Sequence, residues 1–175
     1  KSALVAEIYK PVTARRGYFI AGKFDQYQRN MPYSALAQAL NQFCDYLLTE
    51  NQDVLAAWQR AILGAVGQNG QVLIDVIPHL ERVIGAQPDV PQVGPQETHN
   101  RFNLYVQEYI RAICQPDHPV VLFLDDLQWA DFASLTLFKL LLADAQSRHL
   151  LIIGAYRDAE VSVGHPLLLT LAELE

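Results

Sequence analysis

The chain has 175 residues, of which 51% are hydrophobic and 18% are charged, and its formal net charge is −6 at neutral pH. This composition excludes a disordered chain, and the length suits one domain of ordinary size. No apolar run approaches the roughly 18 residues that a membrane-spanning helix needs. The 13 lysines and arginines are scattered, whereas nucleic-acid-binding surfaces cluster such charges. We therefore expect this segment to bind neither nucleic acid nor membrane.

The first two thirds of the chain predict one strand and a series of helices. Apolar residues at helical spacing predict a helix over residues 2–10, which Pro11 should end. An aromatic and β-branched run bracketed by glycines predicts a strand over residues 17–24, followed by a polar loop to Pro32. Further helical patterns, with a loop rich in proline at 87–95, cover residues 33–49, 54–66, 72–84 and 97–114.

The last third alternates strands with helices. Residues 120–124 and 150–156 are continuously apolar, as buried strands in the middle of a parallel sheet are. Helices are expected over residues 131–146, with Asp131 as the N-cap, and over 165–175. Strand, helix, strand and helix in this order imply right-handed crossovers. The predicted fold class is therefore α/β, with a parallel sheet covered by helices.

The first candidate site residues are two acids at the end of an apolar strand. Asp125 and Asp126 follow Leu124 directly. Sheets of α/β proteins bind ligands at the carboxyl ends of their strands, where one acid can hold Mg²⁺ and a second can polarise an attacking water. The same residues would also suit a charged turn in which Asp126 or Asp131 caps a helix. The pattern alone leaves both interpretations open.

Two further positions fit a nucleotide site by their place in the chain. Lys1 and Ser2 precede a predicted helix, as the last residues of the phosphate-binding motif G-x-x-x-x-G-K-[ST] do. The dipeptide alone is weak evidence for a phosphate-binding loop. It becomes informative because a helix, a strand and a later strand ending in two acids follow it in the order that such a domain needs. Arg157 follows the second apolar strand, where a guanidinium could sense a γ-phosphate. It could equally pair with Asp158 or Glu160 at the surface.

Other reactive or aromatic residues have simpler interpretations. Cys44 and Cys114 lie in apolar stretches without neighbours at metal-ligand spacing, so we expect two reduced, buried thiols and a cytoplasmic protein. The five histidines also lack metal-ligand spacing. Trp58 and Trp129 are expected to pack in the interior. Lys23-Phe-Asp25 lies at the end of the first predicted strand and could face a nucleotide or lie in a surface turn.

Several motifs resemble one family. Asp125-Asp-Leu-Gln-Trp-Ala-Asp131 and Gly154-Ala-Tyr-Arg157 resemble the ATPase module of the signal-transduction ATPases with numerous domains (STAND), and most of all the AAA-type module of large cyanobacterial multi-sensor serine/threonine and hybrid histidine kinases. Residues 17–26, 69–78 and 97–102 are similar to the same family, so the resemblance covers essentially the whole chain.

The resemblance implies a three-layer P-loop NTPase fold. It implies an all-helical insertion between the second and third strands, with the family's first strand missing. Residues 1–175 would form a single core, with the glycine loop upstream and the lid or winged-helix region downstream lying outside it. Backbone N–H groups of the glycine loop make most of the contacts with the phosphates in such a site. We therefore expect residues 1–175 alone to bind ATP poorly.

The resemblance also implies roles for the candidate residues. Lys1 would contact the β- and γ-phosphates of ATP, and Ser2 and Asp125 would hold Mg²⁺. Asp126 would lie beside the catalytic water, and Arg157 would occupy the sensor position.

The expected function is a regulatory switch that binds ATP and hydrolyses it slowly within a multidomain signalling protein kinase. Its partners would be ATP or ADP, other domains of the same chain and further copies of itself. None of the catalytic motifs of a protein kinase is present, so phosphotransfer would come from neighbouring domains. Two alternatives stay open: a signalling scaffold that does not hydrolyse ATP, and the ATPase part of a transcription regulator or replication-initiator-like protein.

Overall fold

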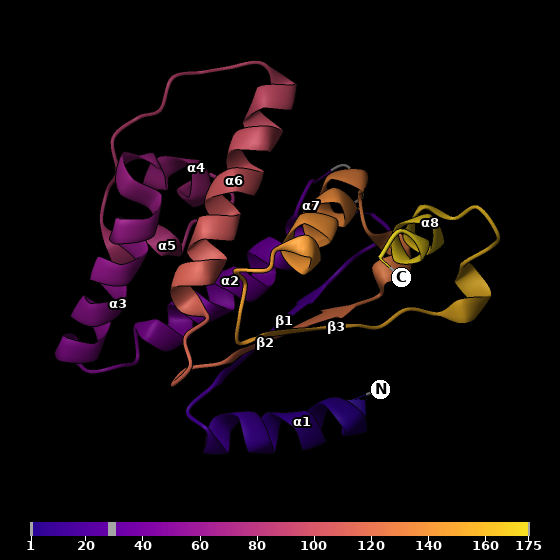
Figure 1. Ribbon diagram of the computed structural model, residues 1–175, viewed down its shortest axis with the longest axis horizontal. Coiled ribbons are helices and arrows are strands. Elements are labelled where there is room, and N and C mark those ends of the chain that lie inside the picture. The colour runs from indigo at the N-terminus through magenta and orange to yellow at the C-terminus, as the bar shows by residue number, and fades with distance from the viewer. Residues whose placement is uncertain (1, 28–30, 175) are drawn as a thin grey trace.

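Three parallel strands form the sheet of this protein (Figure 1). The computed structural model describes residues 2–27 and 31–174, with side chains from residue 7 onward. Its strands, in sheet order, are β1 (Tyr18–Lys23), β2 (Val120–Asp125) and β3 (Leu150–Gly154). Tyr18 pairs with Val120, which pairs in turn with Leu150. The predicted parallel sheet is therefore confirmed, and the apolar β2 lies at its centre.

Helices cover both faces of this sheet, but unequally. Figure 1 shows α1 on one side and α2 to α7 on the other. Every described helix between β1 and β2 belongs to the larger layer. The helices are α1 (Ser2–Ala14), α2 (Ser34–Leu47), α3 (Gln52–Val66), α4 (Gly70–Ile74), α5 (Leu80–Ile84), α6 (Pro95–Ile113), α7 (Phe132–Ala143) and α8 (Pro166–Ala172), with 3-10 turns at Gly67–Asn69, Leu127–Trp129 and Asp158–Glu160. This arrangement of layers fits an α/β fold of the P-loop kind.

Two helix predictions were wrong, and both errors involve proline. The first helix does not end at Pro11, which lies inside α1. A proline in a helix removes the N–H that would bond the carbonyl four residues earlier, here that of Glu7. Both residues are exposed, so water can hydrate that carbonyl. The helix expected over 72–84 is instead split into α4 and α5, and Pro78 lies between them. The Asn41 side chain accepts the backbone N–H of His79 where α5 begins.

The outer edge of β1 is closed by side chains of α2. The backbone N–H of Ala21 donates to Gln42 Oε1 at 2.8 Å, and that of Lys23 donates to Gln38 Oε1 at 2.9 Å. These glutamines lie one helical turn apart and therefore face the strand together. The close approach depends on Gly22, because a Cβ there would lie 1.8 Å from the carbonyl oxygen of Ala35.

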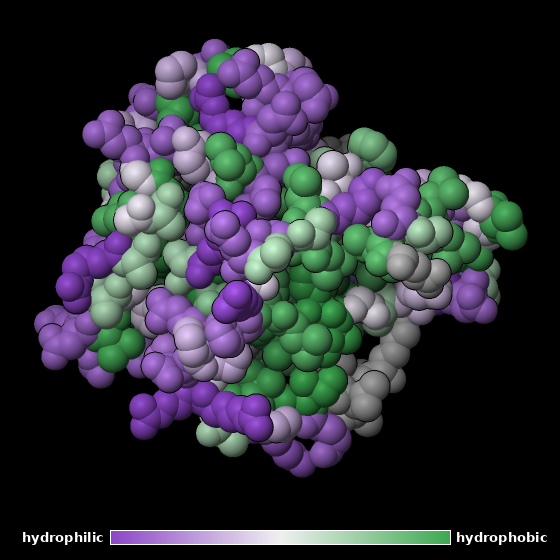
Figure 2. All heavy atoms as spheres, viewed as in Figure 1, coloured by the Kyte–Doolittle hydropathy of each residue, from purple (hydrophilic) through white to green (hydrophobic). Residues whose placement is uncertain are grey.

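The strand β3 is less buried than its apolar sequence predicts. Leu151 is 53% exposed, and no residue of β3 is fully buried. The reason is that β3 pairs on one side only within the described residues and so forms the other edge of the sheet. Figure 2 shows hydrophobic residues gathered on the surface where β3 lies in Figure 1.

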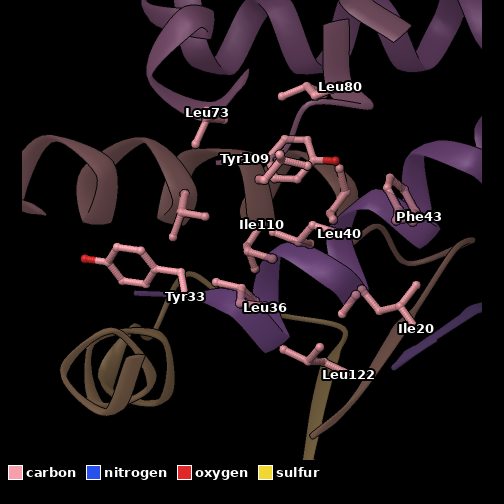
Figure 3. Packing of buried hydrophobic residues seen from close by; sticks show 14 of the residues in the cluster. Ile20, Tyr33, Leu36, Leu40, Phe43, Leu73, Leu80, Tyr109, Ile110 and Leu122 are labelled. Atoms are coloured by element: carbon pink, nitrogen blue, oxygen red, sulfur yellow. The ribbon is translucent and has the colours of Figure 1, made fainter. Parts of the chain in front are cut away.

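The hydrophobic core lies between the sheet and the larger helical layer. Figure 3 shows Leu36 and Leu40 of α2 converging with Ile110 of α6 and Leu122 of β2. Cys44 and Cys114 are buried, unpaired thiols, as predicted. Burial raises the pKa of each to about 12, so neither carries the reactive thiolate form at neutral pH. Trp58 also packs in this core.

Replacing Gly22 by alanine should destabilise the protein, because the added Cβ would collide with the backbone of α2 rather than with a flexible side chain. We expect the free energy of unfolding to fall by about 2 kcal/mol or more, as in overpacked cores. Urea unfolding measures this change. The matched control is Gly64→Ala in α3, where an added Cβ meets no atom within 4 Å. That variant should gain about 0.5–1 kcal/mol from helix propensity, and equal effects of the two substitutions would contradict the steric argument.

Candidate functional site

The candidate residues meet at the carboxyl edge of the sheet. Asp125 ends β2 and lies opposite Lys23, the last residue of β1. Only residues 15–17 separate α1 from β1, so the helix and the strand run antiparallel and α1 begins at this same edge (Figure 1). Their lengths agree, because 13 helical residues and six strand residues each extend about 20 Å.

Asp126 is a buried carboxylate at the centre of this edge. It is 5% exposed and adopts a left-handed backbone conformation with φ of 53°, which aspartate tolerates better than most residues. Lys23 Nζ lies 3.3 Å from its Oδ2, and Arg157 Nε lies 3.4 Å from its Oδ1. Gln128 Nε2 donates to the same Oδ1 at 3.3 Å. Residues that follow all three strands, or end them, thus converge on one carboxylate.

These contacts determine the charge of Asp126. Burial alone would raise its pKa, but hydrogen bonds from Gln128 and Lys23, together with the charges of Arg157 and Lys23, outweigh burial and lower the pKa. The pKa of Arg157 is raised by its hydrogen bond to Glu160 and by the charges of Asp126, Glu160 and Asp125. Asp126 is therefore an anion at neutral pH and acts as a hydrogen-bond acceptor.

Arg157 makes the predicted surface pairing, whereas its role as a γ-phosphate sensor stays a prediction. Its Nη1 donates to Glu160 Oε1 at 2.8 Å, as the surface pairing predicted. The same guanidinium also contacts Asp126, so Arg157 lies at the sheet edge where the two acids lie. Sequence reasoning overlooked Glu160 as part of the site, and it gave no role to Gln128, which is 2% exposed. A polar residue inside the otherwise apolar Leu127-Gln-Trp129 turn was the only signal for Gln128.

Two aspartates flanking this turn have local structural roles. Asp125 Oδ1 accepts the backbone N–H of Asp126 at 2.9 Å. Asp131 caps α7, because its Oδ1 accepts the backbone N–H of Ser134 at 2.8 Å. The helix cap is therefore Asp131, whereas Asp126 makes no capping hydrogen bond. Lys1 lies outside the described residues, as does the side chain of Ser2.

Of the acids at this edge, Asp125 suits a magnesium ion that is shared with a nucleotide. In the described part of the chain, no three His, Cys, Asp or Glu side chains are grouped so that they could hold a metal. Magnesium commonly takes only one or two carboxylates and completes its shell with phosphate oxygens and water. Asp125 at a strand end suits that kind of site.

A separate cavity of about 870 Å³ lies between α4, α6 and the loop over residues 89–93. Tyr33, His99 and Phe102 are among its lining residues, and none of the strand-end residues is. We place the candidate site at the strand ends because the charged groups converge there. None of the helices described combines the length and apolar character that crossing a bilayer requires.

Comparisons with known proteins point to one family. Residues 1–153 match the family model described as "AAA ATPase domain". Hybrid signal transduction histidine kinase G of Dictyostelium discoideum is 38% identical over 124 residues, which are 71% of this chain and 4% of that protein. The chain thus spans a small part of this relative. No solved structure matches the chain significantly.

The ion pairs of Asp126 predict a pH-dependent loss of stability in Asp126→Asn. At neutral pH, the variant should lose about 1–2 kcal/mol of unfolding free energy, a modest value because Lys23 and Arg157 are largely solvated. A lowered folded-state pKa stabilises the protein above the unfolded value of about 4, and this stabilisation is lost as pH falls through the folded pKa.

The difference between the wild type and Asp126→Asn, measured by urea unfolding, should therefore shrink from neutral pH to about pH 3. Asp89→Asn, a change at an exposed loop position, is the control and should show little difference at either pH. A difference for Asp126→Asn that stays constant with pH would mean that its ion pairs contribute nothing to stability.

Proposed function

The chain belongs to the AAA ATPase domain family, and we propose that it is an ATP-binding and ATP-hydrolysing switch module of a multidomain signalling protein. The observation that carries the proposal is the convergence of Asp125, Asp126 and Arg157 at the carboxyl edge of a parallel sheet. Ligands of α/β sheets bind at this edge, and phosphoryl transfer needs cations and acids positioned there.

In this proposal, the start of α1 binds the phosphates. Lys1 contacts the β- and γ-phosphates, and Ser2 contributes its hydroxyl to Mg²⁺. The support is that α1 begins at Ser2 on the same edge as the ends of β1 and β2. The N-terminus of a helix favours anions because its first N–H groups lack intrahelical partners.

Asp125 is the proposed carboxylate ligand of Mg²⁺. When bound, Mg²⁺ neutralises negative charge on the β- and γ-phosphate oxygens. The backbone N–H of Asp126 donates a hydrogen bond to Asp125 Oδ1, and this bond fixes the Asp125 carboxylate at the strand end. This orientation is set before any nucleotide arrives, so little ordering is needed on binding.

Asp126 and Arg157 are the proposed catalytic pair. Asp126 accepts a hydrogen bond from the attacking water, orients it and takes up its proton. Arg157 contacts the γ-phosphate and offsets the charge that develops on it. Arg157 forms an ion pair with Asp126 in this structure. If Arg157 moved toward a phosphate, Asp126 would lose one of its cations and the pKa of its carboxyl would rise.

The signalling context rests on the relative, whose name describes a hybrid histidine kinase. We propose that other domains of the same chain, and further copies of this module, are its partners. A cytoplasmic location is supported by the two reduced thiols, Cys44 and Cys114. One alternative is a scaffold that does not hydrolyse ATP, and turnover measurements distinguish it from a working ATPase. The other alternative is the ATPase module of a transcription regulator or a replication-initiator-like protein.

The test of the proposal is MgATP binding and turnover in the full-length protein that contains residues 1–175. Asp126→Asn should still bind MgATP, but its turnover should fall by about 100-fold or more, because an amide cannot accept the proton. Asp89→Asn should leave both unchanged. No turnover by the wild type would favour the scaffold, and normal turnover by Asp126→Asn would remove that residue from the mechanism.

Arg157→Ala should narrow the difference between ATP and ADP affinity in the same protein. A cation that contacts only the γ-phosphate strengthens the binding of one nucleotide, by about tenfold to a hundredfold for a charge-assisted contact. Calorimetric titration with both nucleotides measures this difference, and the exposed Arg148→Ala is the control. Equal weakening of ATP and ADP would indicate a general structural role for Arg157.

A further inference from the structure

Gln128 is a buried polar residue with every hydrogen-bonding group engaged. Its Nε2 donates to Asp126 Oδ1 at 3.3 Å and to Glu160 Oε2 at 3.1 Å. Its Oε1 accepts the backbone N–H of Arg157 at 3.2 Å. A carboxamide has two N–H donors and one acceptor oxygen, so these contacts use all of its groups. The reverse orientation would face the oxygen toward two carboxylates, so the partners determine how the amide points.

Arg157 connects the same two carboxylates from the solvent side. Its Nε lies 3.4 Å from Asp126, and its Nη1 donates to Glu160 at 2.8 Å. Asp126, Gln128, Glu160 and Arg157 therefore form a closed ring of side chains. The ring joins the turn after β2 to the segment after β3.

Backbone hydrogen bonds run beside this ring but do not orient the side chains. Ala155 donates to the carbonyl of Leu124 at 2.9 Å, and Leu127 donates to the carbonyl of Ala155 at 3.0 Å. These bonds extend the pairing of β2 with β3 past the strand ends. They hold the two segments together, whereas Gln128 contacts the Asp126 carboxylate itself and the main chain at Arg157.

A glutamine suits the charge balance of the ring better than a charged residue would. Lys23 and Arg157 offset the two carboxylates of Asp126 and Glu160, and Asp125 adds a further negative charge near Arg157. A neutral amide donates to both carboxylates without altering this balance. Burying an amide costs free energy unless it is hydrogen-bonded, and here each of its bonds reaches a residue of the ring.

From this ring we infer that Gln128 is a positioning residue, which fixes Asp126 and Arg157 relative to each other across the ends of β2 and β3. The inference rests on the proposed function, because Asp126 and Arg157 would then act together on ATP. The Arg157 side chain is 56% exposed, so without a fixed backbone and fixed partners it would occupy many rotamers. Gln128 reduces that freedom before the nucleotide binds.

Two variants separate the donor and acceptor functions of the amide. Gln128→Glu keeps an oxygen for the N–H of Arg157 but loses both donors. Gln128→Met keeps the chain length and loses all three bonds. Gln52→Glu, the same change at the exposed start of α3, is the control. Thermal unfolding verifies that each variant is folded, and the neutral Met variant keeps the test usable if the Glu variant, which places a third carboxylate beside Asp126 and Glu160, does not fold.

The first measurement is steady-state ATP hydrolysis by the full-length protein. Both Gln128 variants should lower kcat by about tenfold to a hundredfold, as misplaced catalytic groups do, and leave KM for ATP within about twofold. The control should match the wild type. An unchanged kcat in both variants, or a raised KM with unchanged kcat, would overturn the inference.

The second measurement needs no nucleotide. Hydrogen exchange of the peptide containing Arg157, followed by mass spectrometry, reports the N–H that Gln128 Oε1 accepts. This amide should stay protected in the wild type and in Gln128→Glu but exchange about tenfold faster in Gln128→Met, since a lost bond of this kind changes an equilibrium by roughly that factor. If the wild type hydrolyses no ATP, the proposed function fails, and the exchange still decides whether Gln128 fixes the strand ends. Equal protection in all variants would overturn the inference.

Discussion

The pairing of the buried Asp126 carboxylate is the interaction on which this edge of the molecule depends. A carboxylate that is 5% exposed is stable as an anion only if cations and hydrogen-bond donors replace the water it has lost. The donors come from the end of β1, the turn after β2 and the segment after β3. The parallel register, in which Lys23 lies opposite Asp125, brings these segments together. Charge neutralisation and sheet pairing therefore favour the same arrangement of the chain.

Hydrogen bonds link α2, and the residue just before it, both to this arrangement and to the start of α7. Gln38 of α2 accepts the backbone N–H of Lys23 and so fixes the main chain that carries one cation of the site. The backbone N–H of Tyr33, just before α2, lies 3.3 Å from Asp131 Oδ2 and 3.2 Å from Ser134 Oγ at the start of α7. Since both contacts involve α2, a displacement of that helix would move Lys23 and the start of α7 together. The close packing at Gly22 leaves little room for such a displacement unless β1 moves as well.

The sequence predicted what depends on local pattern and failed where distant neighbours decide. Apolar runs identified β1, β2 and β3, and the two acids marked the sheet edge at which the charged side chains converge. The exposure of β3 could not be predicted, because burial depends on whether another element covers the strand. Lys23 was left between two interpretations, since its contact with Asp126 joins residues far apart in the chain. Gln128 belongs to no periodic pattern, and only the positions of Asp126, Glu160 and Arg157 reveal its role. The roles of Lys1, Ser2, Asp125, Asp126 and Arg157 in binding and hydrolysing ATP remain predictions.

The lowered pKa of Asp126 constrains how the proposed site can operate. A carboxylate held by Lys23, Arg157 and Gln128 is a weak proton acceptor, because protonation would weaken all of these contacts. If Asp126 is the base, as proposed, this arrangement would keep it a poor proton acceptor before nucleotide binds. An anionic phosphate would compete with Asp126 for Arg157. Binding of ATP would therefore weaken the contacts that keep the pKa of Asp126 low. Lys23, whose backbone is bonded to Gln38, would stay near the carboxylate and keep it in place. Under the proposed function, the ion pairs that stabilise the empty site thus link the reactivity of Asp126 to the presence of a γ-phosphate.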